Sequence, residues 1–167
     1  MIYASDLEGC IGNGLDLPWP HLDADMKWFV EKTKGKIVVM GSTTWDSLPK
    51  KLPNRINVVV TSKTADDFDK TPDMVVAGKP WDVLESIKSQ HPGQDIIIIG
   101  GRSIYIQFLE YAERIHITLI QDIYNGDTYF SCRGLMQSAY KLEHQATLPG
   151  CNDIPDMLFE TYVRPIQ

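Results

Sequence analysis

The chain has 167 residues and a mass of 18.9 kDa, which fits one domain with its own core and excludes a mini-protein scaffold. Sixteen basic residues against 22 acidic ones give a net charge of −6, and no basic cluster forms, so nucleic acid is not expected as a partner. No apolar run reaches the roughly 18 residues of a membrane span, and the first residues lack the pattern of a secretion signal. We therefore expect a cytoplasmic protein without a membrane segment.

Cysteines and histidines are sparse and do not form a recognisable motif. The three cysteines, Cys10, Cys132 and Cys151, are an odd number at wide spacings, so neither a disulfide framework nor a C-x-x-C motif is expected. The four histidines lack the spacing of known metal-binding motifs, and we expect no metal site. The absence of repeats, low-complexity tracts and long linkers predicts a single domain over residues 1–167.

The first two thirds of the chain alternate between helical and extended patterns. Residues 23–33 have the pattern of an amphipathic helix, and Pro80 opens a second helix over residues 80–90. Four short, β-branched and almost continuously apolar runs predict strands covered on both faces, at residues 37–40, 56–61, 74–77 and 96–99. This alternation predicts an α/β fold with a largely parallel sheet and helices on both of its faces.

The pattern changes after Arg114. Residues 115–120 alternate with a period of two, which indicates a strand with two different faces. Residues 140–147 and 157–163 read as two further strands, joined by a loop that contains glycine and two prolines. We expect the chain to end in an antiparallel hairpin.

Three strand ends carry residues that suit a phosphate. Ligands of open α/β sheets collect beyond the carboxyl ends of the strands. These ends read Gly41-Ser42-Thr43-Thr44, Thr61-Ser62-Lys63 and Gly100-Gly101-Arg102-Ser103. The turn at Gly41 taken alone is also explained by helix capping, and the turn at Gly100 is a weak motif by itself because it lacks the G-x-G-x-x-G fingerprint. Taken together, they predict an extended ligand with several phosphates, such as a dinucleotide.

Asp25 stands out within the helix predicted at residues 23–33. Its helical neighbours Leu22, Trp28 and Phe29 are apolar, and such a setting is costly for a lone carboxylate. A ligand that donates hydrogen bonds would satisfy it. The alternative is an acidic residue favoured in the first turn by the helix dipole.

The stretch from Gly12 to Pro20 is rich in glycine and proline but carries the apolar Leu17 and Trp19. We interpret it as a lid or wall of a binding site. A long connection that covers the core explains the same composition.

In chain order, the motifs resemble dihydrofolate reductase from the first residues to about residue 130. They are Ile11-Gly12, Leu17-Pro18-Trp19, Asp25 with Trp28-Phe29, Val39-Met40-Gly41 with Thr44-Trp45, Leu52-Pro53-Asn54-Arg55, Ile99-Gly100-Gly101 with Ile104-Tyr105, and Thr118 with Gly126-Asp127-Thr128. The resemblance implies a single domain with an eight-stranded, mainly parallel sheet flanked by helices and ending in an antiparallel hairpin. It also implies NADPH-dependent reduction of 7,8-dihydrofolate to tetrahydrofolate, in support of one-carbon metabolism and thymidylate synthesis. A monomer that binds antifolates is expected.

The resemblance carries over to individual positions. The family's catalytic positions match Leu17, Trp19, Asp25, Tyr105 and Thr118. Its substrate positions match Ile2, Ala4, Asp25, Met26, Phe29, Leu48, Leu52, Arg55, Ile99 and Thr118. Its cofactor positions match Ala4, Ile11, Gly12, Leu17, Gly41, Ser42, Thr43, Thr44, Thr61, Ser62, Lys63, Lys79, Gly100, Gly101, Arg102, Ser103, Ile104 and Tyr105.

Two of these matches carry most of the chemistry. Asp25 would accept two parallel hydrogen bonds from the pterin, and Arg55 would pair with the carboxylate of the glutamate tail. A surface arginine after a turn is the alternative for Arg55. Ser42 stands where the family often has an arginine for the 2′-phosphate, so we expect NADPH to be preferred over NADH by a narrow margin.

Two other functions remain open at this point. A riboflavin-pathway reductase would share the Gly-Gly turn, and a noncatalytic nucleotide-binding module would keep the phosphate turns. Asp25 and Arg55 together favour the folate substrate.

Overall fold

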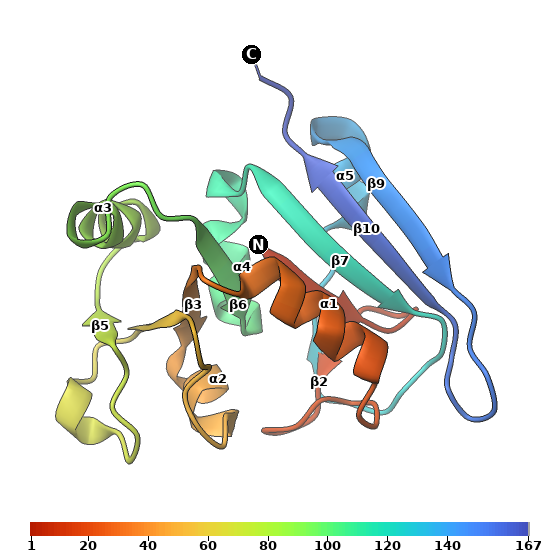
Figure 1. The fold of residues 1–167 in the computed structure, drawn as a ribbon, viewed down its shortest axis with the longest axis horizontal. Coiled ribbons are helices and arrows are strands. Elements are labelled where there is room, and N and C mark those ends of the chain that lie inside the picture. The colour runs from red at the N-terminus through yellow and green to blue at the C-terminus, as the bar shows by residue number, and fades with distance from the viewer. Residues whose placement is uncertain (167) are drawn as a thin grey trace. The chain divides into compact units, whose positions relative to one another are not determined.

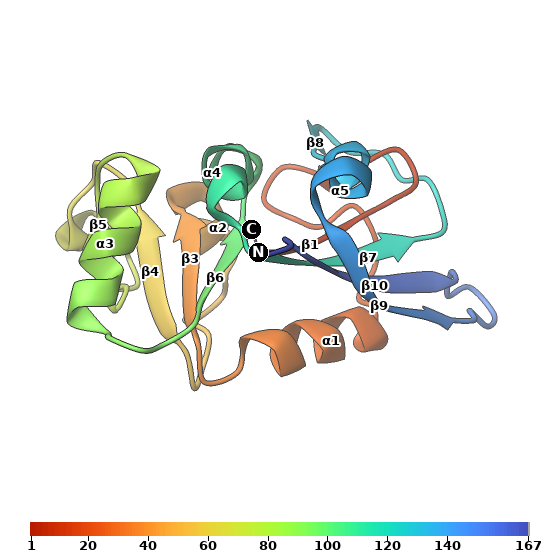
Figure 2. The same cartoon turned by 90° about the horizontal axis from the view of Figure 1, so that it is seen from above.

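A computed structural model describes residues 1–166 of the chain (Figures 1 and 2). The residues group into two compact units, which we describe separately. The first unit contains Met1–Trp28 and the chain from Leu109 onward, and the second contains Phe29–Phe108.

The first unit is built on a mixed sheet with the strand order β1-β7-β10-β9. These strands are β1 (Ile2–Ser5), β7 (Arg114–Ile120), β9 (Lys141–Leu148) and β10 (Met157–Val163). β1 runs parallel to β7, and β10 runs antiparallel to both β7 and β9. The predicted C-terminal antiparallel hairpin is therefore confirmed, with β9 as an exposed edge strand.

Helices cover both faces of this sheet, as Figure 2 shows. α1 (Asp23–Thr33) begins in the first unit and ends in the second, and its first half packs on the sheet through Ala24 and Trp28. α5 (Arg133–Ala139) lies on the other face. The remaining elements of this unit are β2 (Cys10–Gly12), β8 (Thr128–Tyr129) and a short 3-10 helix, η2 (Leu109–Tyr111), with β2 and β8 paired in a separate antiparallel ribbon.

The second unit is built on a parallel sheet with the strand order β5-β4-β3-β6. The strands are β3 (Ile37–Gly41), β4 (Ile56–Val60), β5 (Met74–Val76) and β6 (Ile96–Gly100). The helices are α2 (Ser42–Ser47), η1 (Ala65–Asp67), α3 (Pro80–Gln90) and α4 (Arg102–Phe108). The four apolar runs of the sequence thus become strands, as predicted, and the helix expected at residues 80–90 is present with the same bounds.

One expectation about the fold is only partly met. The predicted sheet of eight strands is instead divided, over the described residues, into two sheets of four strands and a two-stranded ribbon. Apolar runs mark where strands form, but hydrogen bonding between distant segments decides which strands pair. The first unit is mixed rather than parallel because β10 returns antiparallel to β7.

Candidate functional site

Asp25 lies in the first turn of α1, where its carboxylate meets a hydroxyl of the sheet. That hydroxyl belongs to Thr118, a buried residue of β7, and it donates a hydrogen bond to the Asp25 carboxylate. Burial raises the pKa of Asp25 above its ordinary value, and the bond from Thr118 opposes this by stabilising the charged form. The structure therefore brings together two of the expected catalytic residues.

The surroundings of Asp25 in the first unit are apolar, as the sequence predicted from Leu22 and Trp28. Leu22 is buried in a cluster with Phe159, and Trp28 packs against it. The Trp28 and Phe159 rings lie 5.1 Å apart between centroids. Burial of the carboxylate is the main cause of its raised pKa.

The segment from Gly12 to Pro20 is attached to the core through one of its apolar residues. Trp19 is buried in the same apolar cluster and packs edge-to-face on Tyr124, with ring centroids 6.0 Å apart. Leu17, two residues earlier, is 54% exposed. Trp19 therefore anchors the segment in the core, and the interpretation of the segment as a lid or wall stays a prediction.

The turn that precedes Leu17 is fixed by residues 126–128. The Gly14 N–H donates to Asp127 Oδ2 at 3.0 Å, and the Asp127 N–H donates to the Gly12 carbonyl at 3.0 Å. The Thr128 hydroxyl donates to Asp127 Oδ1 at 2.8 Å. The hydrogen bonds from Gly14 and Thr128 lower the pKa of Asp127 and so favour the charged form of its carboxylate.

The other expected residues of the first unit lie on three elements. Ile2 and Ala4 stand on β1, where they pair with His116 and Thr118 of β7. Met26 is 42% exposed on α1. Ile11 and Gly12, which are half-buried, form part of β2.

In the second unit, the carboxyl ends of the parallel strands lie side by side. Gly41 pairs with Val60, and Val60 pairs in turn with Val76, while Met40 pairs with Gly100 on the other side. Because the strands are parallel, the segments after them meet at one edge of the sheet. The expected cofactor segments 41–44, 61–63 and 100–105 are at this edge, together with Lys79 at the start of α3.

Glycines keep this edge clear of side chains. A Cβ on Gly41 would lie 3.1 Å from Ile104 Cγ1, and one on Gly101 would lie 3.4 Å from Thr44 Oγ1. Gly100 has a φ of 122° and packs against the Tyr105 ring, whose hydroxyl donates to the Ile99 carbonyl at 2.8 Å. The two glycine turns are therefore in close contact, and α2 begins at Ser42 with Gly41 as an N-cap residue that makes no side-chain cap.

Hydroxyl groups and cations surround these turns. Ser42, Thr44 and Thr61 are half-buried, whereas Thr43, Ser62, Lys63, Lys79, Arg102 and Ser103 are exposed. The Lys63 ammonium lies 5.5 Å from the centroid of the Phe68 ring. Hydroxyls, exposed cations and glycines without side chains suit a ligand that carries phosphates, so the edge fits a dinucleotide.

Arg55 lies in the loop between α2 and β4, and its guanidinium is held by contacts within the second unit. Nε donates to the Pro53 carbonyl at 2.9 Å, and Nη1 donates to Thr33 Oγ1 at 3.0 Å. The guanidinium carbon also lies 5.9 Å from the centroid of the Phe29 ring. Two of five N–H donors are used in this way, and the others suit a carboxylate. Burial lowers the pKa of Arg55 below its ordinary value.

Leu52 and Leu48, both half-buried, pack at the edge of the second unit's core beside Trp45. α2 ends at Ser47, so Leu48 lies just beyond this helix. The ring of Phe29, also half-buried, completes the apolar residues near Arg55.

Sequence reasoning missed Asn57, which the structure places under the loop that carries Leu52 and Arg55. The available signal was an amide inside an otherwise apolar strand, since buried polar residues are rare without a role. Over residues 1–166 the structure contains no group of three or more side chains able to hold a metal ion. None of the helices in that range is long and apolar enough to cross a membrane.

The chain matches the family model described as dihydrofolate reductase over residues 1–164. It is 35% identical over 129 residues to the dihydrofolate reductase of Bacillus subtilis (strain 168), covering 77% of this chain and 73% of that protein. It is 34% identical over 132 residues to the dihydrofolate reductase of Haemophilus influenzae, covering 78% of this chain and 76% of that protein. A dihydrofolate reductase from Enterococcus faecalis, solved in complex with NADP(H) and RAB-propyl, superposes with a TM-score of 0.82 at 27% identity, covering 98% of this chain and 94% of that one.

Proposed function

The chain belongs to the dihydrofolate reductase family and catalyses the NADPH-dependent reduction of 7,8-dihydrofolate to tetrahydrofolate, and we propose that Asp25 is its central catalytic residue. The observation that supports this role is the hydrogen bond from Thr118 to a carboxylate set among apolar side chains. Family membership also decides against a riboflavin-pathway reductase and a noncatalytic nucleotide-binding module.

Asp25 orients and polarises the pterin. A carboxylate can accept two parallel hydrogen bonds from the ring N–H and the exocyclic amino group of the pterin. Its negative charge in a water-poor setting favours the protonated form of the ring at nitrogen 5, where the product carries a new proton. Thr118 holds the carboxylate in place, and water delivers the proton.

Other residues of the first unit support this step. Trp19 is fixed in the core and orders water near the carboxylate. The exposed Leu17 and Met26 contact the ligands, and the backbone of Ile2 and Ala4 completes the pterin contacts.

The second unit supplies the residues for the folate tail. Arg55 pairs with the glutamate carboxylate through the donors that its bonds to Pro53 and Thr33 leave over. Phe29, Leu48 and Leu52 line the walls around the aminobenzoyl group, which needs apolar contacts.

NADPH supplies the hydride equivalent when it is bound. The hydroxyls and backbone N–H groups of residues 41–44 and 100–103 bind its phosphates. Thr61, Ser62, Lys63 and Lys79 bind the 2′-phosphate region, with Arg102 close in the sequence to the glycine turn. Tyr105 and Ile104 hold the glycine turn in shape, while Ile99 presents its carbonyl at the end of β6, and Ile11 and Gly12 contact the cofactor from β2.

Incubation of the protein with NADPH and dihydrofolate, followed through the near-ultraviolet absorbance of NADPH, tests this function. Consumption of NADPH must depend on dihydrofolate. Consumption that is equal without dihydrofolate would contradict the proposal. Several further features stay predictions: one functional domain over residues 1–167, a monomer, a cytoplasmic location and inhibition by antifolates.

A further inference from the structure

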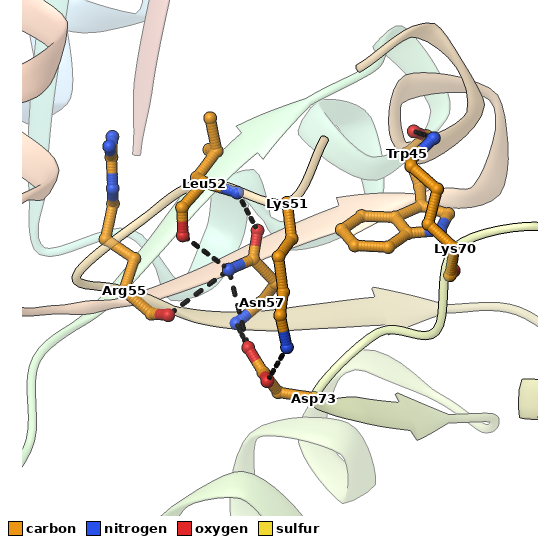
Figure 3. Close-up of polar contacts among 7 residues, drawn as sticks. All are labelled: Trp45, Lys51, Leu52, Arg55, Asn57, Lys70 and Asp73. Carbon is orange, nitrogen blue, oxygen red and sulfur yellow. Dashed lines mark hydrogen bonds and ion pairs between the residues drawn. The ribbon is translucent and has the colours of Figure 1, made fainter. Parts of the chain in front are cut away.

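Asn57 is a fully buried amide in an otherwise apolar part of the second unit. It is the second residue of β4, and the valines that follow it, Val58 and Val59, are also fully buried. A buried amide must have all of its hydrogen bonds satisfied to be tolerated in such a place. Asn57 satisfies them with the loop that precedes its strand, as Figure 3 shows.

Three hydrogen bonds tie the Asn57 side chain to this loop. Oδ1 accepts from the Leu52 N–H at 3.0 Å, and Nδ2 donates to the Leu52 carbonyl at 2.9 Å. Nδ2 also donates to the Arg55 carbonyl at 3.2 Å. The amide therefore holds both ends of the segment from Leu52 to Arg55, in which Asn54 adopts a left-handed conformation with a φ of 57°.

Asp73 and Lys51 form a second layer around Asn57. Asp73 Oδ2 accepts from the Asn57 N–H at 2.8 Å, and from its Nδ2 at 3.4 Å. Asp73 Oδ1 accepts from Lys51 Nζ at 2.6 Å. Partial burial acts to raise the pKa of Asp73, but the bonds from Lys51 and Asn57 outweigh it and hold that pKa below its usual value.

We propose that Asn57 is a positioning residue for the folate tail, acting through Leu52 and Arg55, with Asp73 and Lys51 holding the amide in place. In Figure 3 the Arg55 side chain points away from Asn57 while its carbonyl faces the amide. The Arg55 guanidinium is bound to the Pro53 carbonyl of the same loop, so a shift of the loop moves the guanidinium with it. Pairing with a planar carboxylate depends on such placement. This inference rests on the proposed function.

Asn57→Asp tests the proposal with almost no change in size. The new carboxylate can still accept from the Leu52 N–H, but its second oxygen faces the carbonyls of Leu52 and Arg55 and the carboxylate of Asp73. We expect KM for dihydrofolate to rise by about tenfold, and kcat and KM for NADPH to change less than about twofold. A dihydropterin without the glutamate tail should be reduced as efficiently as by the parent enzyme.

A double-mutant cycle with Arg55→Ala separates positioning from general damage. In the Arg55→Ala background, Asn57→Asp should add less than about a twofold further rise in KM. Asn57→Asp could instead lower kcat/KM equally for dihydrofolate and for the tail-less pterin, or its effect on KM could be fully additive with that of Arg55→Ala. Either result would show that Asn57 merely stabilises the fold and would overturn the proposal.

Asp73→Asn decides the question if Asn57→Asp fails to fold. It removes the charge that pairs with Lys51 and should raise KM for dihydrofolate, but not for the tail-less pterin, by about two- to fivefold. Asp95→Asn is the matched control, because Asp95 forms a surface ion pair with Lys36 at 3.7 Å in the same unit. Equal effects of Asp73→Asn and Asp95→Asn would contradict the proposal.

The cycle also distinguishes this inference from the proposed function. If the parent enzyme does not reduce dihydrofolate, the proposed function fails. If Arg55→Ala is selective for the tail and Asn57→Asp is not, only the role of Asn57 fails.

Discussion

The buried hydroxyl of Thr118 in β7 donates a hydrogen bond to the carboxylate of Asp25 in the first turn of α1. The two residues come from distant parts of the chain and meet on one face of the mixed sheet. Burial raises the pKa of Asp25, and the hydrogen bond from Thr118 offsets part of that effect. The site therefore holds a carboxylate that is desolvated yet oriented.

Asp25→Asn should abolish most turnover while leaving the fold intact. A neutral amide cannot favour the protonated pterin by its charge, so we expect kcat for dihydrofolate to fall by about 10²–10⁴ at neutral pH. Steady-state rates from about pH 5 to about pH 8 measure this effect. A rate close to that of the parent enzyme across the whole range would remove Asp25 from the mechanism.

The same variant should be more stable than the parent at neutral pH. The folded state raises the pKa of Asp25, so it binds the proton more tightly than the unfolded chain does. The contribution of Asp25 to stability therefore falls as the pH rises from the unfolded value of about 3.9 through the higher folded pKa. We expect the Tm of Asp25→Asn to match that of the parent in acid and to exceed it by about 2–4 °C at neutral pH. Thermal unfolding across this range measures the difference, and a gap that shrinks as the pH rises would refute the assignment.

Arg55 substitutions should act on the glutamate tail. Arg55→Ala or Arg55→Lys is expected to weaken binding of dihydrofolate by about 1.5–3 kcal/mol, because a charged and geometrically matched pair is lost. Binding measured by fluorescence titration should hardly change for a pterin without the tail. Equal losses of binding affinity for both ligands would show that Arg55 has only a structural role.

Cofactor preference should respond to charge at the edge of the parallel sheet. NADPH is expected to be preferred over NADH, with Lys63→Ala lowering the ratio of kcat/KM values and Ser42→Arg raising it. Because Lys63 is exposed, the ratio should also fall with salt, as screening acts over about 8–10 Å near physiological ionic strength. The ratio of kcat/KM for NADPH to that for NADH, measured at low and high salt, tests this. A ratio that is unchanged by both substitutions would show that the 2′-phosphate binds elsewhere.

Gly126 leaves no room for a side chain. A Cβ there would clash with Cys10 Sγ and with the Gly12 carbonyl, so Gly126→Ala should destabilise the protein by about 1–3 kcal/mol. Gly134→Ala is the matched control, since nothing lies within 4 Å of its Cβ position in α5. Alanine is favoured over glycine within a helix, so this control should be neutral or stabilising. Urea unfolding compares the two, and equal effects would contradict the predicted clash.

The sequence by itself determined the local elements of this protein. The apolar runs became β3, β4, β5 and β6 with ends shifted by at most one residue, and residues 23–33 and 80–90 formed helices with the predicted bounds. These patterns are visible because burial repeats with the period of the helix or strand within a few neighbouring residues. Family motifs also identified the chemistry, because residues such as Asp25 and Arg55 are unusual where they occur.

Only the tertiary structure decided which distant residues meet. It divided the strands of the described residues into three sheets. It also brought the Thr118 hydroxyl to the Asp25 carboxylate and the Gly14 N–H to the Asp127 carboxylate. It also brought the Asp73 carboxylate to the Asn57 N–H, although the two residues lie 16 positions apart and nothing in the sequence near either one specifies that hydrogen bond. A hydrogen bond between side chain and backbone depends on position to within a few tenths of an ångström, and that position is set by packing of the whole unit rather than by local periodicity.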